Sequence, residues 1–425
     1  MINTGDTAFM MICAALVFIM TPGLAFFYGG LVSRKNVLTI MMQSFISMGV
    51  VTILWFIIGF SLTFGPDVHG LVGGLKYMFL HGVGMEANPD YGSTIPFMSF
   101  FSYQQMFAIL TPALITGAFA DRVNFKSYLV FLVLWSLLIY IPLAHWVWGG
   151  GFLQQMGVVD FAGGIVVHAS AGLAALASVF FVGKRTVVSK AEMEPHNVTH
   201  VALGTALLWF GWFGFNAGGA LGANPLAATA FINTDLGASA AMVTWLIISW
   251  IREKSPSFVG VLTGAVAGLA TITPGAGFVK PWAAIIIGVL AGIICYAAVQ
   301  FRKKLDWDDA LDVWGVHGVG GLVLGASEHL HLAAVHVAGQ IVARGSVNFQ
   351  ALARGQGAAQ VALGVGLHDA DGVGFGERRA YGGIGLLEVL RSQFHDDGFS
   401  HAITLPRTLR RGFPVPSRSG PRRAA

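Results

Sequence analysis

The sequence predicts an all-α, polytopic membrane protein that contains an inverted repeat of five plus five spans. Composition is the first indication: of 425 residues, 55% are hydrophobic and only 11% are charged, whereas soluble domains carry about 25% charged residues. Apolar runs of about twenty residues, the length of a membrane span, recur along the chain. A pattern of polar residues in the fifth run also returns in the tenth.

Ten apolar runs are long enough to be spans, and their bounds define the helices that we expect. Barrel strands would show a shorter, alternating pattern instead. The opening residues, MINTGDTAF, lack the positively charged start of a signal peptide, so we expect the first run to be retained as a span. The runs lie at about 7–32, 37–64, 97–119, 127–149, 160–182, 198–221, 226–250, 256–279, 281–301 and 310–327.

Positive charges alternate between the loops and predict which side of the membrane each loop occupies. The gaps after even-numbered runs contain only Lys76 and Lys280, whereas those after odd-numbered runs are rich in lysine and arginine. Because positive loops stay cytoplasmic, we expect a multi-pass protein of the inner (cytoplasmic) membrane with its N-terminus outside. The positive loops contain Arg34, Lys35, Arg122, Lys126, Lys184, Arg185, Lys190, Arg252, Lys254, Arg302, Lys303 and Lys304.

A carboxylate, a histidine and a Gly-Leu pair recur in the same register in two distant runs. Each histidine follows its aspartate by eight residues, or about 12 Å along a helix. The fifth span is expected to run inward and the tenth outward, so the two histidines reach equal depth and can meet. The pattern consists of Asp160, His168 and Gly172-Leu173 in the fifth run, and of Asp309, His317 and Gly321-Leu322 in the tenth.

The histidine pair is the strongest functional signal, because an ionisable residue inside a span is costly. Two facing imidazoles can pass hydrogen bonds or protons along an apolar lumen. The alternative is that His168 and His317 are satisfied core histidines. We expect no metal site, because no third cysteine, histidine or carboxylate has matching spacing.

Asp160 opens the fifth span at the expected outer face. A carboxylate there favours the helix N-terminus and would stabilise a nearby cation, although a plain N-cap is an equally open interpretation. Asp309 is the inner counterpart, for which a structural role is expected. Aromatic residues near the outer ends of spans either form interfacial belts or line a vestibule that binds a small cation; they include Phe107, Trp146, Trp148, Phe213 and Phe215.

Several function classes are excluded by what the spans lack. They contain no phosphate-binding Gly-Lys-Ser/Thr loop, nucleophile elbow or metalloprotease motif, so neither an enzyme nor an ATP-driven pump is expected. No cofactor is expected, and nucleic-acid binding is disfavoured because the spanning region has no basic face. Cys13 and Cys295 lie in apolar runs, which predicts buried thiols rather than a disulfide.

From about Ser327 the composition changes to arginine, histidine and glycine, and the last lysine is Lys304. Apolar stretches at 332–343 and 358–367 are too short to span. The tail is interpreted either as a disordered appendage or as the product of a shifted reading frame. We therefore expect a transmembrane transporter domain over residues 1–326 and an aberrant tail over 327–425.

Residues 3–325 resemble the ammonium transporter (Amt/Mep/Rh) family, on its bacterial and archaeal Amt side. The motifs that carry the resemblance are GDTAF, MTPGLAFFYGGLVSRKNV, DFAGGIVVHASAGLAAL, WFGWFGFNAGG and DDALDVWGVHGVGGL, in this order. The resemblance implies an eleven-span fold with two inverted halves, a homotrimer with one pore per subunit, and transport of ammonium and methylammonium. It also implies a P-II signalling protein as partner of the C-terminal segment. Neither the eleventh span nor that segment is recognisable after Ser327.

The resemblance assigns roles to individual residues. Phe107 and Trp148 match the outer cation-recruitment site, which Asp160 supports, and Phe107 and Phe215 match a stacked phenyl gate. His168 and His317 match the pore histidines. Gly219 stands where the family usually has a serine, which removes a hydroxyl acceptor from the recruitment site, and Tyr103 stands where phenylalanine is common.

Three functional alternatives follow. The chain is a transporter, an ammonium sensor or receptor that conducts little, or a transport-defective variant that keeps the pore residues. A gas channel of the Rh type is disfavoured, because such proteins generally lack the recruitment tryptophan that Trp148 matches. The sequence leaves open whether transport is electrogenic or carries neutral ammonia.

Overall fold

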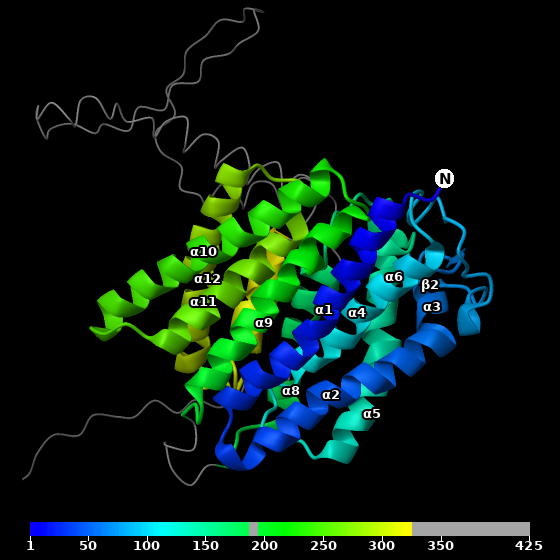
Figure 1. Ribbon diagram of the computed structural model, residues 1–425. Helices are drawn as coiled ribbons and strands as arrows, with labels where there is room; N and C mark the ends of the chain where they lie inside the picture. The colour runs from blue at the N-terminus through cyan, green and yellow to red at the C-terminus, as the bar shows by residue number, and fades with distance from the viewer. Residues whose placement is uncertain (187–193, 325–425) are drawn as a thin grey trace, which may run out of the picture. The chain divides into compact units, whose positions relative to one another are not determined.

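The computed structural model describes residues 1–186 and 194–324, which belong to one compact helical unit (Figure 1). Its α-helices are α1 (Thr4–Leu31), α2 (Val37–Leu54), α3 (Phe60–Phe64), α4 (Phe97–Ile115), α5 (Phe125–Trp135), α6 (Ile141–Trp148), α7 (Phe152–Gln155), α8 (Ser170–Val182), α9 (Val198–Ala217), α10 (Pro225–Glu253), α11 (Phe258–Ile272), α12 (Pro281–Lys304) and α13 (Val319–Leu324).

Shorter elements interrupt or join these helices. The π-helical segments are η2 (Trp55–Gly59), η4 (Ser136–Tyr140), η5 (Gly164–Ala169) and η9 (Trp314–Gly318). The 3₁₀ turns are η1 (Arg34–Asn36), η3 (Met78–Leu80), η7 (Gly218–Ala220) and η8 (Thr273–Gly275). Strands β1 (Asp67–Val68) and β2 (Val72–Gly73) form an antiparallel hairpin that pairs Asp67 with Gly73.

Local sequence explains where several helices begin. An asparagine side chain that precedes a helix accepts a hydrogen bond from a backbone N–H of the first turn, which satisfies a donor that the helix itself leaves unpaired. Proline is the first residue of α10 and α12, where its fixed φ suits the helix and its missing N–H costs nothing. The capping asparagines are Asn3, Asn124, Asn197 and Asn224.

In the described part of the chain, eight helical segments are long and apolar enough to cross a membrane, which makes this a multi-pass membrane protein. Of the remaining predicted spans, the third is the 19-residue helix α4. The tenth is the shorter apolar segment Trp314–Leu324. The predicted tail over 327–425, and the question of an eleventh span, lie outside the described residues.

The loops lie at opposite ends of the bundle, as the alternation of their charges predicts. At one end, polar contacts join the loops after the first, third, fifth and ninth spans. The side chain of Asn36 donates a hydrogen bond to Asp121, and Nη2 of Arg185 donates to Oδ1 of Asp308 at 2.8 Å. At the other end, the N–H of Asn3 donates to the carbonyl of Thr94 at 2.7 Å. Four of the five loops that carry the positive charge therefore share one end.

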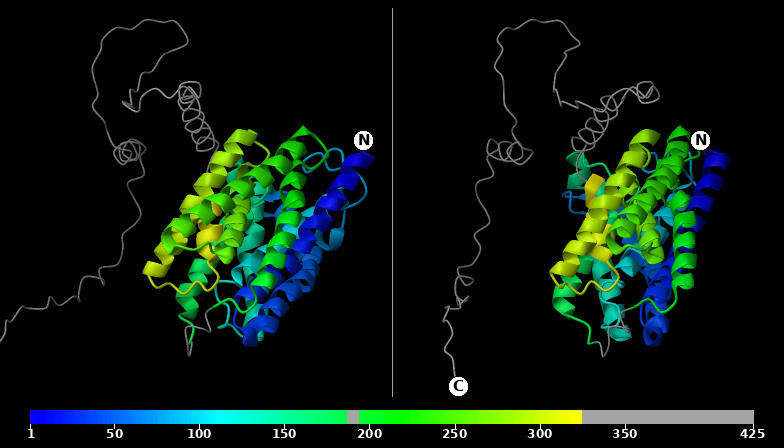
Figure 2. Two further views of the ribbon diagram at one scale, coloured as in Figure 1. Left: turned by 60° about the vertical axis from the view of Figure 1, so that its left-hand side comes forward. Right: turned by 90° about the vertical axis from the view of Figure 1, so that its left-hand side faces the viewer.

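Close helix packing brings distant segments of the chain together. Helix α9 lies between α1 on one side and α10 and α11 on the other, as both sets of views show (Figure 1, Figure 2). Glycine makes the α1–α9 contact possible: a Cβ on Gly204 would lie 2.2 Å from the backbone nitrogen of Phe27. Small residues allow this approach between membrane helices.

The two repeated segments cross each other at their glycines. A Cβ on Gly172, in α8, would lie 2.1 Å from the Cα of Gly318, and one on Gly321, in α13, would lie 2.5 Å from the carbonyl oxygen of Gly164. Each glycine of the repeated Gly-Leu pair thus packs against the histidine-bearing segment of the other half. The inverted repeat explains why both must be glycine.

Candidate functional site: a narrow passage between two cavities

His168 and His317 meet inside the bundle, as their opposite directions predict. Their Nδ1 atoms are 3.3 Å apart and their rings are stacked at 5.2 Å and 22°. Both side chains are buried, one in η5 and the other in η9. A hydrogen bond between two Nδ1 atoms requires that one donates while the other accepts. The pair can therefore relay a hydrogen bond or a proton.

The histidines line a central cavity that is small and otherwise apolar. Its volume is about 10 Å³, roughly the space that one water molecule requires. Nε2 of His168 is buried and has no hydrogen-bond partner among the described residues. A small molecule with one polar group fits this opening, whereas a hydrated ion does not. The other lining residues are Met20, Leu24, Phe27, Leu110, Leu114, Leu208, Trp212 and Val266.

Two phenyl rings pack together between His168 and the Trp148 ring. The rings of Phe107 and Phe215 are 4.4 Å apart at 44°, and Phe215 also stacks on His168 at 5.6 Å. Tyr103 fixes both: its hydroxyl donates to the Phe215 carbonyl at 2.6 Å, and its ring contacts Phe107 edge-on at 4.8 Å.

A cavity of about 290 Å³ lies beyond these rings and is lined by Phe107, Trp148, Asp160 and Gly219, among others. It is called the outer cavity below, because the loop charges predict that this end of the bundle faces outside. The Trp148 ring meets Phe107 edge-on at 6.0 Å and 83°, and its indole N–H donates to the backbone carbonyl of Asp160 at 2.8 Å. Aromatic faces attract cations through their quadrupole. The predicted recruitment residues therefore converge, which the sequence alone does not reveal.

The Asp160 carboxylate is an N-cap, one of its two expected roles. It accepts four backbone N–H groups, those of residues 163 to 166, at 2.7 to 3.0 Å. Gly163 makes the tight turn with φ of +109°, where glycine is favoured. Both oxygens are thus occupied by the backbone, so Asp160 contributes its charge to the outer cavity rather than a free ligand oxygen.

Gly219 is tightly covered at the position where a serine is common. A Cβ there would lie 2.6 Å from the backbone oxygen of Phe161 and 3.1 Å from its ring. A side chain at this position would therefore force Phe161 to shift.

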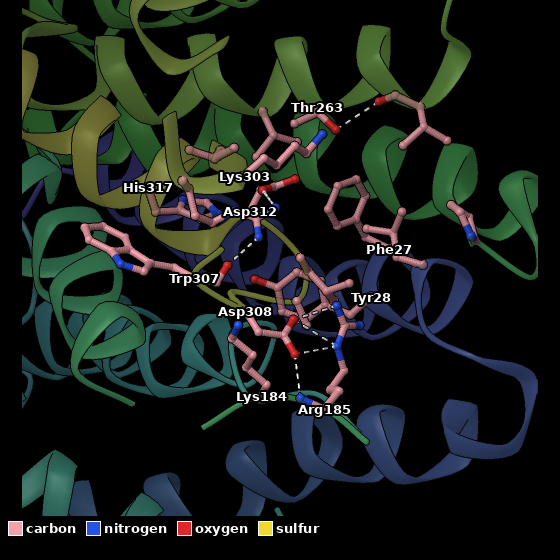
Figure 3. A pocket seen from close by; sticks show the side chains of 18 of the residues that line it. Phe27, Tyr28, Lys184, Arg185, Thr263, Lys303, Trp307, Asp308, Asp312 and His317 are labelled. Atoms are coloured by element: carbon pink, nitrogen blue, oxygen red, sulfur yellow. Dashed lines mark hydrogen bonds and ion pairs between the residues drawn. The ribbon is translucent and has the colours of Figure 1, made fainter. Parts of the chain in front are cut away.

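An inner cavity of about 630 Å³ reaches His317 from the end of the bundle that carries the positive loops (Figure 3). Ion pairs line it: Arg185 with Asp308 at 2.8 Å, Arg302 with Asp312 at 2.5 Å, and Lys184 with Asp306. Trp307 lies beside them. Sequence reasoning predicted no site role for these residues, although the acidic segment DDALD before His317 is a visible signal.

No group of three or more potential metal ligands occurs within residues 1–186 and 194–324. Cys13 and Cys295 are both buried, as the apolar runs predict, and both are free.

A histidine-lined constriction that lies between two larger cavities in a bundle of apolar helices is typical of a membrane transport protein. The family model described as Ammonium Transporter Family matches residues 8–362, and the chain belongs to this family. It is 50% identical over 318 residues to the ammonium transporter of Bacillus subtilis, covering 75% of this chain and 78% of that protein. It is 46% identical over 320 residues to ammonium transporter Amt1 of Archaeoglobus fulgidus, covering 75% and 79%. The crystal structure of Saccharomyces cerevisiae Mep2 matches with a TM-score of 0.72 and 36% identity over 78% of each chain.

Proposed function

We propose that this protein transports ammonium, and methylammonium, across the cytoplasmic membrane by recruiting the cation, removing its proton and passing ammonia through the histidine-lined passage. The observation that carries the proposal is the His168–His317 pair, at 3.3 Å, in an apolar constriction between two cavities. The protein acts as a homotrimer, with its N-terminus and outer cavity outside the cell.

Recruitment takes place in the outer cavity. The rings of Trp148 and Phe107 replace part of the hydration shell of ammonium through cation–π contacts, worth about 0.5–2 kcal/mol each. The charge of Asp160, buried nearby, adds attraction without direct ligation because its oxygens already accept four N–H groups. The absence of a serine hydroxyl at Gly219 leaves this site more dependent on its aromatic rings.

Deprotonation follows from the size and polarity of the constriction. A bare cation in a passage of about 10 Å³ would lose its water and gain little in return, which costs far more than moving a neutral molecule. Ammonium therefore gives up its proton before the Phe107–Phe215 pair opens. Ammonia then crosses beside the histidines, where the unpartnered Nε2 of His168 offers it a hydrogen bond. The inner cavity returns it to water.

The route of the proton separates two forms of this mechanism. If the proton follows along the paired imidazoles, transport carries current; if it returns outside, transport is neutral. The shared hydrogen bond between the two Nδ1 atoms favours the first form, because it supplies the relay that an apolar lumen otherwise lacks.

The test is ammonium-evoked current in proteoliposomes that contain the whole chain, beside empty liposomes and a variant with both His168→Leu and His317→Leu. We expect a saturable current from the unmodified chain and its loss in the double variant. The amount of inserted protein, measured on the same vesicles, controls for assembly. An undiminished current in the double variant would exclude the histidines as the proton route.

A further inference from the structure

A third buried histidine, His145, lies outside the passage, in the last turn of α6. The ring of His145 is buried and both of its nitrogens face oxygen atoms: Nδ1 is 2.7 Å from the backbone carbonyl of Thr63, and Nε2 is 2.9 Å from Oδ1 of Asp67. Thr63 belongs to α3 and Asp67 to β1, so the ring joins three elements that lie together in Figure 1.

The partners determine the protonation of this pair. A carbonyl oxygen only accepts, so Nδ1 must carry a proton. Nε2 then faces a carboxyl group, and the contact requires a second proton between the two. This proton joins Nε2 of His145 and Oδ1 of Asp67 in one hydrogen bond at 2.9 Å, which holds the pKa of the Asp67 carboxyl below its usual range.

The pair clamps the hairpin onto the end of α6. The Asp67 carboxylate also accepts the N–H of Gly70, with 2.9 Å to Oδ1 and 3.0 Å to Oδ2. On the facing segment, the indole N–H of Trp146 donates to the carbonyl of Leu71 at 2.7 Å, and the N–H of Phe152 donates to the carbonyl of Gly70 at 3.0 Å. The hairpin is thus bound on both sides of residues 148–151.

Trp148, one helical turn after His145, is the ring that this clamp positions. The carbonyl of His145 accepts the N–H groups of Gly149 at 2.9 Å and Gly151 at 3.0 Å, and so ends the helix. Gly149 lies directly against Thr63, since a Cβ there would be 2.0 Å from its carbonyl oxygen. The backbone on both sides of Trp148 is therefore placed by contacts of His145.

We propose that His145 and Asp67 are positioning residues for cation recruitment: the pair holds the end of α6 so that the Trp148 ring faces the outer cavity. This inference rests on the proposed function, in which Trp148 binds ammonium. It makes the hairpin, whose residues line neither the outer nor the central cavity, a determinant of the apparent affinity for ammonium. A competing explanation is that Asp67, an outward-facing carboxylate, merely attracts cations to the outer surface.

Two substitutions separate geometry from charge. Asp67→Asn removes the charge but keeps the shape: its amide nitrogen can donate to a neutral Nε2, while its oxygen accepts the Gly70 N–H. Asp67→Glu keeps the charge but moves it by one methylene, which breaks the short contacts. Glu86→Gln, an exposed carboxylate of the same interhelical segment, is the matched control for surface charge. Trp148→Leu, alone and combined with Asp67→Glu, tests whether Asp67 affects the apparent affinity through the Trp148 ring.

The readout is ammonium-evoked current in proteoliposomes as a function of ammonium concentration. We expect Asp67→Glu to raise the half-saturating concentration by about threefold to tenfold with little change in maximal current, in line with the penalty for displacing a binding group. Asp67→Asn and Glu86→Gln should stay near the unmodified chain. In the Trp148→Leu background, Asp67→Glu should add no further shift, because coupled residues are not additive.

The opposite pattern overturns the inference. If Asp67→Asn raises the half-saturating concentration and Asp67→Glu does not, the charge of Asp67, and not its position, determines the apparent affinity. An equal shift in both backgrounds would show that the pair does not act through Trp148. If Trp148→Leu raises that concentration and Asp67→Glu leaves it unchanged, only the positioning role fails. An unchanged concentration in Trp148→Leu itself would refute the recruitment site and the positioning role together.

Discussion

Two aspartates at equivalent positions of the repeat have different surroundings. Asp160 satisfies four backbone N–H groups with its two oxygens. Asp309 accepts the N–H of Trp314 at 2.7 Å through Oδ2, whereas its Oδ1 is buried without a partner among the described residues. Sequence spacing predicts the equivalence of the two residues but not this contrast, which depends on the turn that follows each of them.

The incomplete hydrogen bonding of Asp309 predicts a pH-dependent stability. Burial, with the charge of Asp312 acting in the same direction, raises the pKa of the Asp309 carboxyl to about 7, against about 4 in an unfolded chain. Between these values the folded state binds more protons, so its stability falls as pH rises. Asp309→Asn cannot ionise and keeps an oxygen for Trp314. We expect Asp309→Asn to remove part of the loss of stability that accompanies rising pH.

The measurement is the thermal midpoint of the detergent-solubilised protein at pH 5 and pH 8. The thermal midpoint of the unmodified chain should fall further between pH 5 and pH 8 than that of Asp309→Asn, by about 3 °C or more. The exposed carboxylate Asp90 provides the control, since Asp90→Asn should show the same fall in thermal midpoint between pH 5 and pH 8 as the unmodified chain. Equal losses in the unmodified chain and Asp309→Asn would mean that the buried carboxyl does not titrate in this range.

Among the residues of the site, chemistry was easier to predict from sequence than geometry. The histidines were predictable because polar residues inside apolar runs stand out and because the repeat gave them a common depth. The convergence of Trp148 with Phe107 was not predictable, since aromatic residues at span ends are commonly explained by the membrane interface. His145 was missed altogether, because it sits at the end of a span where a polar residue is unremarkable in sequence.

At the scale of elements, apolar length predicted the helices, but not where they are interrupted. The π-helical segments η5 and η9 each contain one pore histidine, and such segments often mark functional positions. They arise where the two halves cross and where backbone N–H groups turn towards Asp160, so they depend on contacts between distant residues. The β1–β2 hairpin is likewise too short to leave a periodic signal.

The crossing of the two halves predicts that the smallest side chain is already too large for it. The Cβ of Gly172→Ala would lie 2.1 Å from the Cα of Gly318, a contact that only a backbone shift can relieve. Overpacking of this kind typically costs about 1–3 kcal/mol, and the shift would also separate the histidines. We expect a lower thermal midpoint and a reduced ammonium current.

Gly49→Ala is the matched control for this substitution. Gly49 lies within α2, and a Cβ there would meet no atom within 4 Å, so alanine should be neutral or slightly stabilising through its helix propensity. Equal thermal midpoints for the two alanine variants would mean that the halves do not pack as closely as the repeat requires.

At the scale of the whole molecule, the passage is built from parts that are far apart in sequence. Phe107, His168 and Phe215 face one another across the first and second halves, and His317 closes the inner side. All of them lie in the described residues 1–186 and 194–324. The passage residues that the structure describes therefore precede the change in composition at about Ser327, although the family model continues to match up to residue 362.

This arrangement predicts that a chain ending at Ala326 still transports. Every pore residue is retained, and the arginines of the tail, which ten spans would leave outside against the positive-inside bias, are removed. We expect membrane insertion at least equal to that of the full chain and a similar saturable ammonium current per inserted protein. A third chain ending at Ala362 locates any required segment. If the chain ending at Ala362 conducts while the one ending at Ala326 is inserted but silent, residues 327–362 belong to the transporter domain, and the domain boundary proposed from composition is wrong.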